Sequence, residues 1–160
     1  MLKQDRAPIA AAFSGGGDSL ALLVIAADWA AAHGRRLVAL TVDHRLQSGS
    51  DRWAAWCKER ARRLGIEHRT LVWEGWSGRG NLAGQARAAR HALLAQAARE
   101  AGANVILMAH TFDDLLETRW MRSAGARLGA PSEWAPSPAW PQGRFVFVLR
   151  PLLGIRRARL

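Results

Sequence analysis

The sequence lacks residue types on which whole classes of protein depend. It contains one cysteine, Cys57, and no tyrosine in 160 residues. A lone cysteine excludes a disulfide framework or a multi-cysteine metal site within one chain, so a reducing, cytoplasmic setting is expected. No apolar run approaches the roughly 20 residues of a membrane-spanning helix, and no membrane partner is expected.

Acidic residues are also scarce. The chain has 23 basic and 13 acidic residues, which gives a formal net charge of +10. Such an excess favours a polyanionic partner, because each neutralised phosphate releases counterions. However, nearly all the basic residues are arginines and alanine is abundant, a bias that genome composition also produces. The charge alone therefore leaves nucleic-acid binding and compositional bias equally open.

Short apolar runs alternate with segments of helical periodicity along the chain. Strands are expected at residues 8–13, 37–42, 68–73, 104–110 and 145–149, and helices at 18–33, 53–64, 82–101 and 112–124. This order predicts parallel pairing through right-handed crossovers. The expected fold is a single α/β domain with a doubly wound, mainly parallel five-stranded sheet flanked by helices. Residues 125–143, rich in proline, glycine and serine, are expected to form a long irregular insertion.

The tryptophans and the cysteine can be sorted by their positions. Trp134 and Trp140 lie in the insertion and are expected to pin it to the body, although stacking on a nucleic-acid base is the alternative. Cys57 lies on an apolar helix face, which predicts a buried structural thiol. Four further tryptophans fall on helical stripes and are expected in the core: Trp29, Trp53, Trp56 and Trp120.

Polar clusters follow three of the predicted strands, at 14–19, 43–48 and 110–117. In doubly wound sheets, ligands bind beyond the carboxyl ends of the strands. We therefore expect the three clusters to converge on one active site.

The first cluster, in FSGGGDSLALLV, places three glycines between two serines, after a strand and before a helix. Glycines let the backbone approach an anion, and the free N–H groups at a helix start point toward it. Neither a Walker GK[ST] nor a GxGxxG fingerprint is present. Asp18 would repel a phosphate unless a cation lay between them, which predicts a bridging Mg²⁺. The alternative is a tight turn in which Asp18 favours the helix dipole.

The third cluster, AHTFDDLLET at 109–118, puts His110 at a strand end and carboxylates in the next helical turns. Thr111 and Asp114 form a plausible capping pair, and capping with dipole effects would explain the acidic residues. Alternatively, carboxylates beside a triphosphate would hold Mg²⁺ or receive an ammonium group. Arg87 and Arg90, three residues apart on one helix, could together meet an anion, or could form a solvated basic face.

These residues resemble a known family. Ser14, Gly15, Gly16, Asp18 and Ser19 match the SGGxDS signature of PP-loop ATP pyrophosphatases. Within that superfamily the chain is similar to the tRNA(Ile)-lysidine synthetases over nearly its whole length. The matching stretches are TVDHRL at 41–46, LGIEH at 64–68, NLAGQARAARHALL at 81–94, AHTFDDLLETRWMR at 109–122 and RPLLGIRR at 150–157.

The resemblance implies a reaction and its partners. ATP and Mg²⁺ are the implied cofactors, with cleavage of ATP between its α and β phosphates. The implied reaction adenylates C2 of the wobble cytidine of an isoleucine tRNA with a CAU anticodon. The ε-amino group of free lysine then displaces AMP, giving lysidine. Whether the chain forms a homodimer stays open.

The resemblance also implies roles for individual residues. Nucleotide contacts fall on Ser14, Gly15, Gly16, Gly17, Asp18, Ser19, Thr41, Val42 and Asp43. Catalytic roles fall on Asp18, Arg87, His110, Asp113 and Asp114. Substrate contacts fall on Asn81, Arg87, Arg90, Asp113, Asp114 and Glu117, and Mg²⁺ is expected on Asp18 and Asp114.

The sequence departs from the family pattern at a few positions. Thr111 and Leu115 stand where the family commonly has histidine and glutamine, and Arg45 stands at a common glycine. These departures keep open a catalytically impaired nucleotide- or RNA-binding module. A second alternative is another PP-loop activity: tRNA thiolation, which generally needs paired cysteines or an iron–sulfur cluster, or small-molecule amidation. The family generally continues after RPLL with helical tRNA-binding domains, which this chain, ending at Leu160, does not include.

Overall fold

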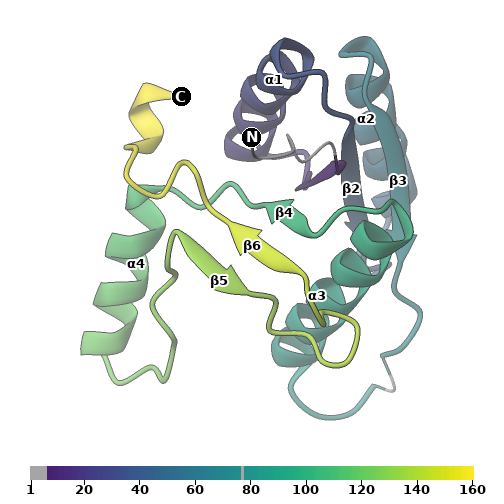
Figure 1. Ribbon diagram of the computed structural model, residues 1–160. Helices are drawn as coiled ribbons and strands as arrows, with labels where there is room; N and C mark the ends of the chain where they lie inside the picture. The colour runs from purple at the N-terminus through teal and green to yellow at the C-terminus, as the bar shows by residue number, and fades with distance from the viewer. Residues whose placement is uncertain (1–6, 77) are drawn as a thin grey trace.

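The computed structural model describes residues 7–76 and 78–160. Its centre is a six-stranded sheet in the order β3-β2-β1-β4-β6-β5 (Figure 1). All neighbouring strands are parallel except the edge pair of β5 and β6. The strands are β1 (Ile9–Ala12), β2 (Leu37–Asp43), β3 (Glu67–Val72), β4 (Val105–Leu107), β5 (Trp134–Pro136) and β6 (Phe147–Leu149).

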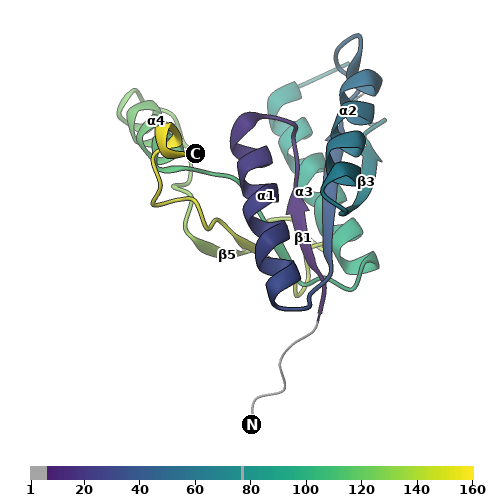
Figure 2. The same ribbon diagram turned by 90° about the horizontal axis from the view of Figure 1, so that it is seen from above.

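Helices cover both faces of this sheet, as Figure 2 shows from above. Helices α1 (Gly17–Ala32) and α2 (Ser50–Arg63) pack on one face, and α3 (Leu82–Glu100) packs on the other. Helix α4 (Phe112–Ser123) stands beside the sheet near a short C-terminal 3₁₀ turn, Arg157–Arg159 (Figure 1). The doubly wound, mainly parallel fold predicted from the sequence is thus confirmed.

Alternating residues of β1 supply the two hydrophobic cores. Ile9 and Ala11 face the α1–α2 layer, together with Leu23, whereas Ala10 faces α3 with Leu94. Successive side chains of a strand point to opposite faces, so an entirely apolar strand is required where both faces are covered. The small alanines leave room for the large aliphatic side chains of the helices.

The predicted number of strands was too low by one. Residues 125–143 are not irregular throughout, because they contain β5, which pairs antiparallel with β6. Trp134 stacks on Phe147 across this pair, with ring centroids 5.3 Å apart, so it does fasten the insertion to the sheet. Pro136 is tolerated because β5 is an edge strand, where a missing N–H breaks no interior ladder. The proline and glycine content of the segment concealed the strand.

Three of the four tryptophans expected in the core are not there. The exposed fractions are 42% for Trp29, 50% for Trp53 and 73% for Trp120. Only Trp56 packs against a core cluster. In α1, the side chains of Leu22, Leu23, Ala26 and Ala30 already fill the buried stripe. Cys57 is buried as expected, and burial raises the pKa of its thiol.

Strand register fixes where the site forms. Ala11 lies opposite Leu107 in the β1–β4 pair, so Ser14 and His110, each three residues further on, emerge at the same end of the sheet. The strand order reverses between β1 and β4, and such a switch point is where open α/β sheets bind ligands. Across residues 7–76 and 78–160, no helix has the length and apolarity to cross a membrane.

Candidate functional site

A cavity of about 690 Å³ opens at this switch point. Its floor is apolar and includes Phe13, Leu40, Leu94 and Met108. Its polar wall combines residues from segments far apart in the sequence: Ser14, Gly16, Gly17, Asp18, Ser19, His44, Arg90, His110 and Arg157. All three predicted clusters therefore contribute to one cavity, although clusters 43–48 and 110–117 each supply a single residue, His44 and His110.

The SGGGDS segment forms a compact loop that leads directly into α1. Gly15 adopts a φ of +82°, a conformation that favours glycine. The Ser14 and Ser19 hydroxyls lie 3.1 Å apart, and Ser19 Oγ donates to the Gly16 carbonyl at 2.9 Å. No atom lies within 4 Å of a Cβ built on Gly17. The loop thus offers open backbone and a helix start to the cavity, which suits an anion.

Asp18 is paired with an arginine from the other end of the chain. Its carboxylate accepts from Nε of Arg157 at 2.7 Å. The same guanidinium lies 3.4 Å from Asp114 Oδ1 and 3.6 Å from Glu117 Oε1. These contacts, with Asp18 first, raise the pKa of Arg157. The Arg157 guanidinium therefore links the phosphate loop to the carboxylates at the start of α4.

The first turn of α4 is capped as the sequence predicts. Oδ2 of Asp114 accepts from the Thr111 backbone N–H at 2.6 Å and from its hydroxyl at 2.8 Å. Burial opposes the charged form of Asp114, but the Thr111 hydrogen bonds outweigh it and hold the pKa of this carboxyl below its usual value. Asp113 accepts from the backbone N–H of Arg157 at 2.7 Å. The α4 carboxylates are thus ordered by capping and by the C-terminal turn.

His110 lies on the cavity wall in its neutral form. Arg150 Nε donates to His110 Nδ1 at 3.1 Å, which places the imidazole proton on Nε2. Burial, and then the charge of Arg150, lower the pKa of His110. Arg150 is itself buried and also donates to the Ser132 carbonyl. His110 is therefore a hydrogen-bond donor through Nε2 at neutral pH.

The two arginines of α3 do not meet in one place. Arg90 lines the main cavity, whereas Arg87 is exposed and lines a separate hollow between α3 and residues 138–142. Within the described part of the chain, Arg90 Nε is buried without a hydrogen-bond partner, and no carboxylate pairs with this residue. Burial lowers the pKa of Arg90. A buried guanidinium facing a cavity in this way suits an anionic ligand.

The TVDH segment contributes Val42 and His44 to the cavity lining, whereas Thr41 and Asp43 lie outside it. Thr41 is buried behind the cavity, where its hydroxyl donates to the Phe13 carbonyl at 2.7 Å and contacts His68 at 2.8 Å. Asp43 closes a turn by accepting from the Arg45 N–H at 2.9 Å. Arg45 has a φ of +50°, the conformation for which the family's common glycine is suited.

The remaining predicted residues lie around the cavity but do not line it. Gly15 is buried beneath Trp53, and Asn81 caps α3 by accepting from the Gly84 N–H at 3.1 Å. Asp113, Asp114 and Glu117 reach the cavity only through Arg157. The predicted residues outside the lining are Gly15, Thr41, Asp43, Asn81, Arg87, Asp113, Asp114 and Glu117.

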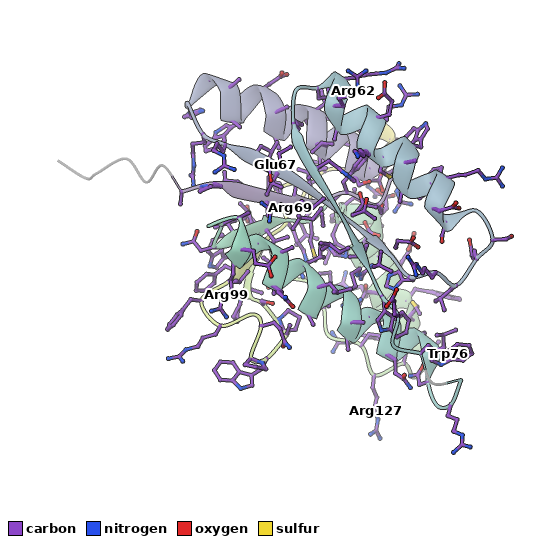
Figure 3. The ribbon with its side chains drawn as sticks, turned by 90° about the vertical axis from the view of Figure 1, so that its right-hand side faces the viewer. Arg62, Glu67, Arg69, Trp76, Arg99 and Arg127 are labelled. Atoms are coloured by element: carbon purple, nitrogen blue, oxygen red, sulfur yellow. The ribbon has the colours of Figure 1, made fainter. Side chains whose placement is uncertain are left out.

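Arg157 is the main residue that the sequence analysis missed. It lies within the stretch RPLLGIRR, whose resemblance to the family implies no role for any of its side chains. Its role could have been suspected from its position after the last strand, β6, because the chain leaves the carboxyl ends of the strands on the side of the site. Several other basic side chains lie away from the cavity: Figure 3 shows Arg62 on α2, Arg99 near the end of α3 and Arg127 in the segment after α4.

A divalent cation can be tested against these side chains. No group of three or more His, Cys, Asp or Glu residues within the described ranges could hold a metal alone. Mg²⁺ commonly takes only one or two protein carboxylates and completes its shell with phosphates and water. Asp18 and Asp114 contact different nitrogens of the Arg157 guanidinium, so two carboxylates, the ligand type that Mg²⁺ prefers, lie beside one cationic group at the loop. The residues therefore fit Mg²⁺.

Comparison with known proteins agrees with this geometry. Residues 1–160 match the ATP_bind_3 family model, described as a PP-loop domain. Proteins named tRNA(Ile)-lysidine synthase are 52% identical over 97% of this chain in Caulobacter vibrioides and 43% identical over 96% in Hyphomonas neptunium. One from Bradyrhizobium sp. is 43% identical over 98% of the chain. The chain spans 38%, 42% and 44% of the lengths of these three relatives.

Solved structures share the fold at low sequence identity. The U34-tRNA thiolase NcsA from Methanococcus maripaludis, solved with its [4Fe-4S] cluster, has a TM-score of 0.73 and 20% identity. The matched region covers 97% of this chain and 55% of the thiolase chain. NMN synthetase from Francisella tularensis gives a TM-score of 0.59 at 17% identity, over 97% of this chain and 59% of that one. The match of the family model over the whole chain is decisive, and the chain belongs to the PP-loop family of ATP-binding domains.

Proposed function

We propose that this chain is the ATP-dependent catalytic domain of a tRNA(Ile)-lysidine synthase. The observation that carries the proposal is the cavity lined by the phosphate loop and by Arg157, whose guanidinium also contacts the carboxylates of α4 outside the lining. The similarity to curated enzymes of that name supports the same substrate, an isoleucine tRNA whose wobble base is cytidine. The chain spans less than half the length of those relatives.

In the first step, ATP lies with its phosphates on the loop and its base toward the apolar floor. The C2 carbonyl oxygen of cytidine attacks the α phosphorus, and the bond to the β phosphate breaks to release pyrophosphate. The backbone of Gly16 and Gly17, which line the cavity, stabilises together with Arg90 the charge that develops on the phosphates. Neutral His110 donates a hydrogen bond from Nε2 to a phosphate oxygen.

Asp18 and Asp114 are the residues that would hold Mg²⁺. When bound, the cation neutralises phosphate charge and orients the triphosphate for in-line attack. Asp18 is at the loop itself, and Oδ1 of Asp114, which the Thr111 bonds leave unused, lies 3.4 Å from Arg157 and would exchange that contact for the cation. Arg157 contacts both carboxylates and compensates their charge.

In the second step, free lysine binds at the acidic start of α4. Its ε-ammonium would pair with Glu117 while Asp114 faces the metal, and the contact of Glu117 with the Arg157 guanidinium supports such a pairing with a cationic side chain. A carboxylate takes one proton from the ammonium, and the neutral amine attacks C2 of the adenylated cytidine. The bond between C2 and the phosphoester oxygen breaks, AMP leaves, and lysidine forms.

Two other activities are less well supported. Thiolation by a cluster-bearing enzyme, such as the thiolase with the similar fold, needs several thiolate ligands, and Cys57 is the one cysteine of this chain and is buried. A binding module without catalysis would not need carboxylates gathered around a cation beside the phosphate loop. We also propose a cytoplasmic location, in keeping with tRNA and free lysine as substrates.

Labelled lysine tests the proposal directly. The full 160-residue chain is incubated with ATP, Mg²⁺, radiolabelled lysine and unmodified isoleucine tRNA. Label is expected in the RNA with one AMP released per lysine, and omission of either lysine or tRNA should remove the modified product. The same tRNA with uridine at the wobble position is the matched control. Turnover that is unaffected by omitting lysine would reject lysine as the nucleophile.

A further inference from the structure

The outer side of the phosphate loop is held by a tryptophan from another element. Trp53, on α2, donates its indole N–H to the Ser14 carbonyl, with an Nε1···O distance of 2.8 Å. Ser14 is the first residue of the loop and lies 39 positions earlier in the sequence. Because the side chain of Trp53 is half exposed, hydrophobic burial alone does not account for its placement.

The indole ring also covers Gly15. A Cβ built on Gly15 would lie 2.7 Å from Cζ2 of Trp53, closer than real Cβ contacts allow. By contrast, a Cβ on Gly17 would meet nothing within 4 Å. The ring therefore occupies the space of a Gly15 side chain on the outside of the loop, while Gly16 and Gly17 line the cavity on its inside.

Trp53 is itself fixed by a series of aromatic contacts. It stacks on Trp56 with ring centroids 5.0 Å apart and an interplanar angle of 11°. Trp56 in turn lies 6.4 Å from the ring of Phe13, the residue that precedes the loop, and Arg60 sits 5.0 Å above Trp56. Aromatic pairs of this kind resist displacement of either ring. These contacts therefore run from Ser14 through Trp53 and Trp56 to Phe13, and both ends of the series lie at the phosphate loop.

We propose that Trp53 is a positioning residue for ATP. By binding the Ser14 carbonyl and covering Gly15, it fixes the outer side of the loop and so keeps Gly16 and Gly17 in the geometry that receives phosphates. Trp53 does not line the cavity and touches no substrate. The inference deepens the proposed function and rests on its ATP site, but not on the identity of the nucleophile or of the RNA.

The test compares Trp53→Phe with Trp29→Phe in the full chain. Phenylalanine keeps a ring at position 53 but removes the donor to Ser14. Trp29 is a matched control because it is similarly exposed, lies on a neighbouring helix and stacks on His33 instead of the loop. Two quantities are measured: the amide ¹H–¹⁵N signals of Gly15, Gly16 and Gly17 without nucleotide, and the Kd for ATP by calorimetry.

Trp53→Phe is expected to shift the loop glycine signals and to weaken ATP binding about threefold to tenfold, the effect of one lost hydrogen bond. Its midpoint of thermal unfolding should match that of Trp29→Phe, which should leave the loop signals and the Kd unchanged. Gly15→Ala, which pushes against the ring, should also weaken ATP binding. Unchanged loop signals and Kd in Trp53→Phe would overturn the proposal.

The nucleotide-free measurement separates this inference from the proposed function. Displaced loop signals and weaker ATP binding in Trp53→Phe, together with no lysine transfer by the wild type, would uphold the positioning role and reject lysidine formation. Lysine transfer by the wild type, together with unchanged loop signals and an unchanged Kd in Trp53→Phe, would uphold lysidine formation and reject the positioning role. A Kd that rises equally in both tryptophan variants would also overturn the positioning role.

Discussion

Nε of Arg157 lies 2.7 Å from Oδ2 of Asp18, and this contact joins residues 139 positions apart. It joins two ends of the chain at the cavity, because Asp18 lies in the first turn of α1 and Arg157 follows the last strand. The same guanidinium reaches the carboxylates of α4. The contact links the part of the site that suits phosphates to the part that suits a cation.

Replacing Arg157 with alanine should affect ATP binding more than stability. The side chain is half exposed, and exposed ion pairs contribute only about 0–1 kcal/mol to unfolding free energy. Without the guanidinium, however, Asp18 and Asp114 would face the triphosphate uncompensated, so ATP should bind about tenfold more weakly. Calorimetry with ATP and urea unfolding measure the two effects. Arg159→Ala, in the same turn, is the control and should change neither.

Asp18→Ala should abolish AMP release while leaving the fold intact. Asp18 is the loop carboxylate assigned to Mg²⁺, and removing a metal ligand beside the phosphates removes charge stabilisation in the transition state. Radiolabelled ATP separated by thin-layer chromatography measures AMP. Asp28→Ala, further along the same helix and exposed, should retain wild-type release. Full activity in Asp18→Ala would remove Asp18 from the metal-binding role.

Asp114→Asn should destabilise the protein in a pH-dependent way. The carboxylate accepts two hydrogen bonds from Thr111, and loss of such a cap costs about 1 kcal/mol of unfolding free energy. Because the pKa of Asp114 is lowered in the fold, its stabilisation is complete above its unfolded pKa and disappears as pH falls through the folded value. Urea unfolding should therefore show a deficit at pH 7 that vanishes in strong acid. A deficit that is constant with pH would contradict the ionised cap.

His91 should make the fold sensitive to mild acid. Burial, and then the charges of Arg90 and Arg87, lower its pKa from 6.5 to about 4. Between these values the unfolded chain binds a proton that the folded chain does not, so stability falls as pH drops from 6.5 to 4, by at most about 3 kcal/mol. His91→Gln should flatten unfolding free energy over this range. His33→Gln, at an exposed residue, should leave the curve unchanged.

Much of the fold could be predicted because local and global signals agree. The apolar β1 and β2 segments end in glycine or polar residues, and the alternation of strands with helices restricts the fold to a few doubly wound, mainly parallel topologies. Strand β5 could not be predicted, because Trp134–Pro136 gains its pairing from β6 and its stacking from Phe147. Such contacts depend on the folded edge of the sheet and leave no periodic pattern.

The site likewise contains residues that the local sequence predicts and residues that are placed by contacts between distant segments. The phosphate loop and the Thr111–Asp114 cap are local, and both were identified from neighbouring residues. The role of Arg157 depends on a contact over 139 positions, and the placement of Trp53 depends on a helix packing across Gly15. Helical periodicity predicted a core position for Trp53, because periodicity records which face is apolar and not what that face meets.

The products of ATP labelled at the α phosphate test the central claim most directly. The full chain is incubated with this ATP, Mg²⁺, lysine and unmodified isoleucine tRNA, and the nucleotides are separated. The α–β cleavage proposed for this cavity predicts labelled AMP, formed in a one-to-one ratio with lysine attached to the RNA. Labelled ADP, or AMP formed at the same rate without RNA, would contradict it.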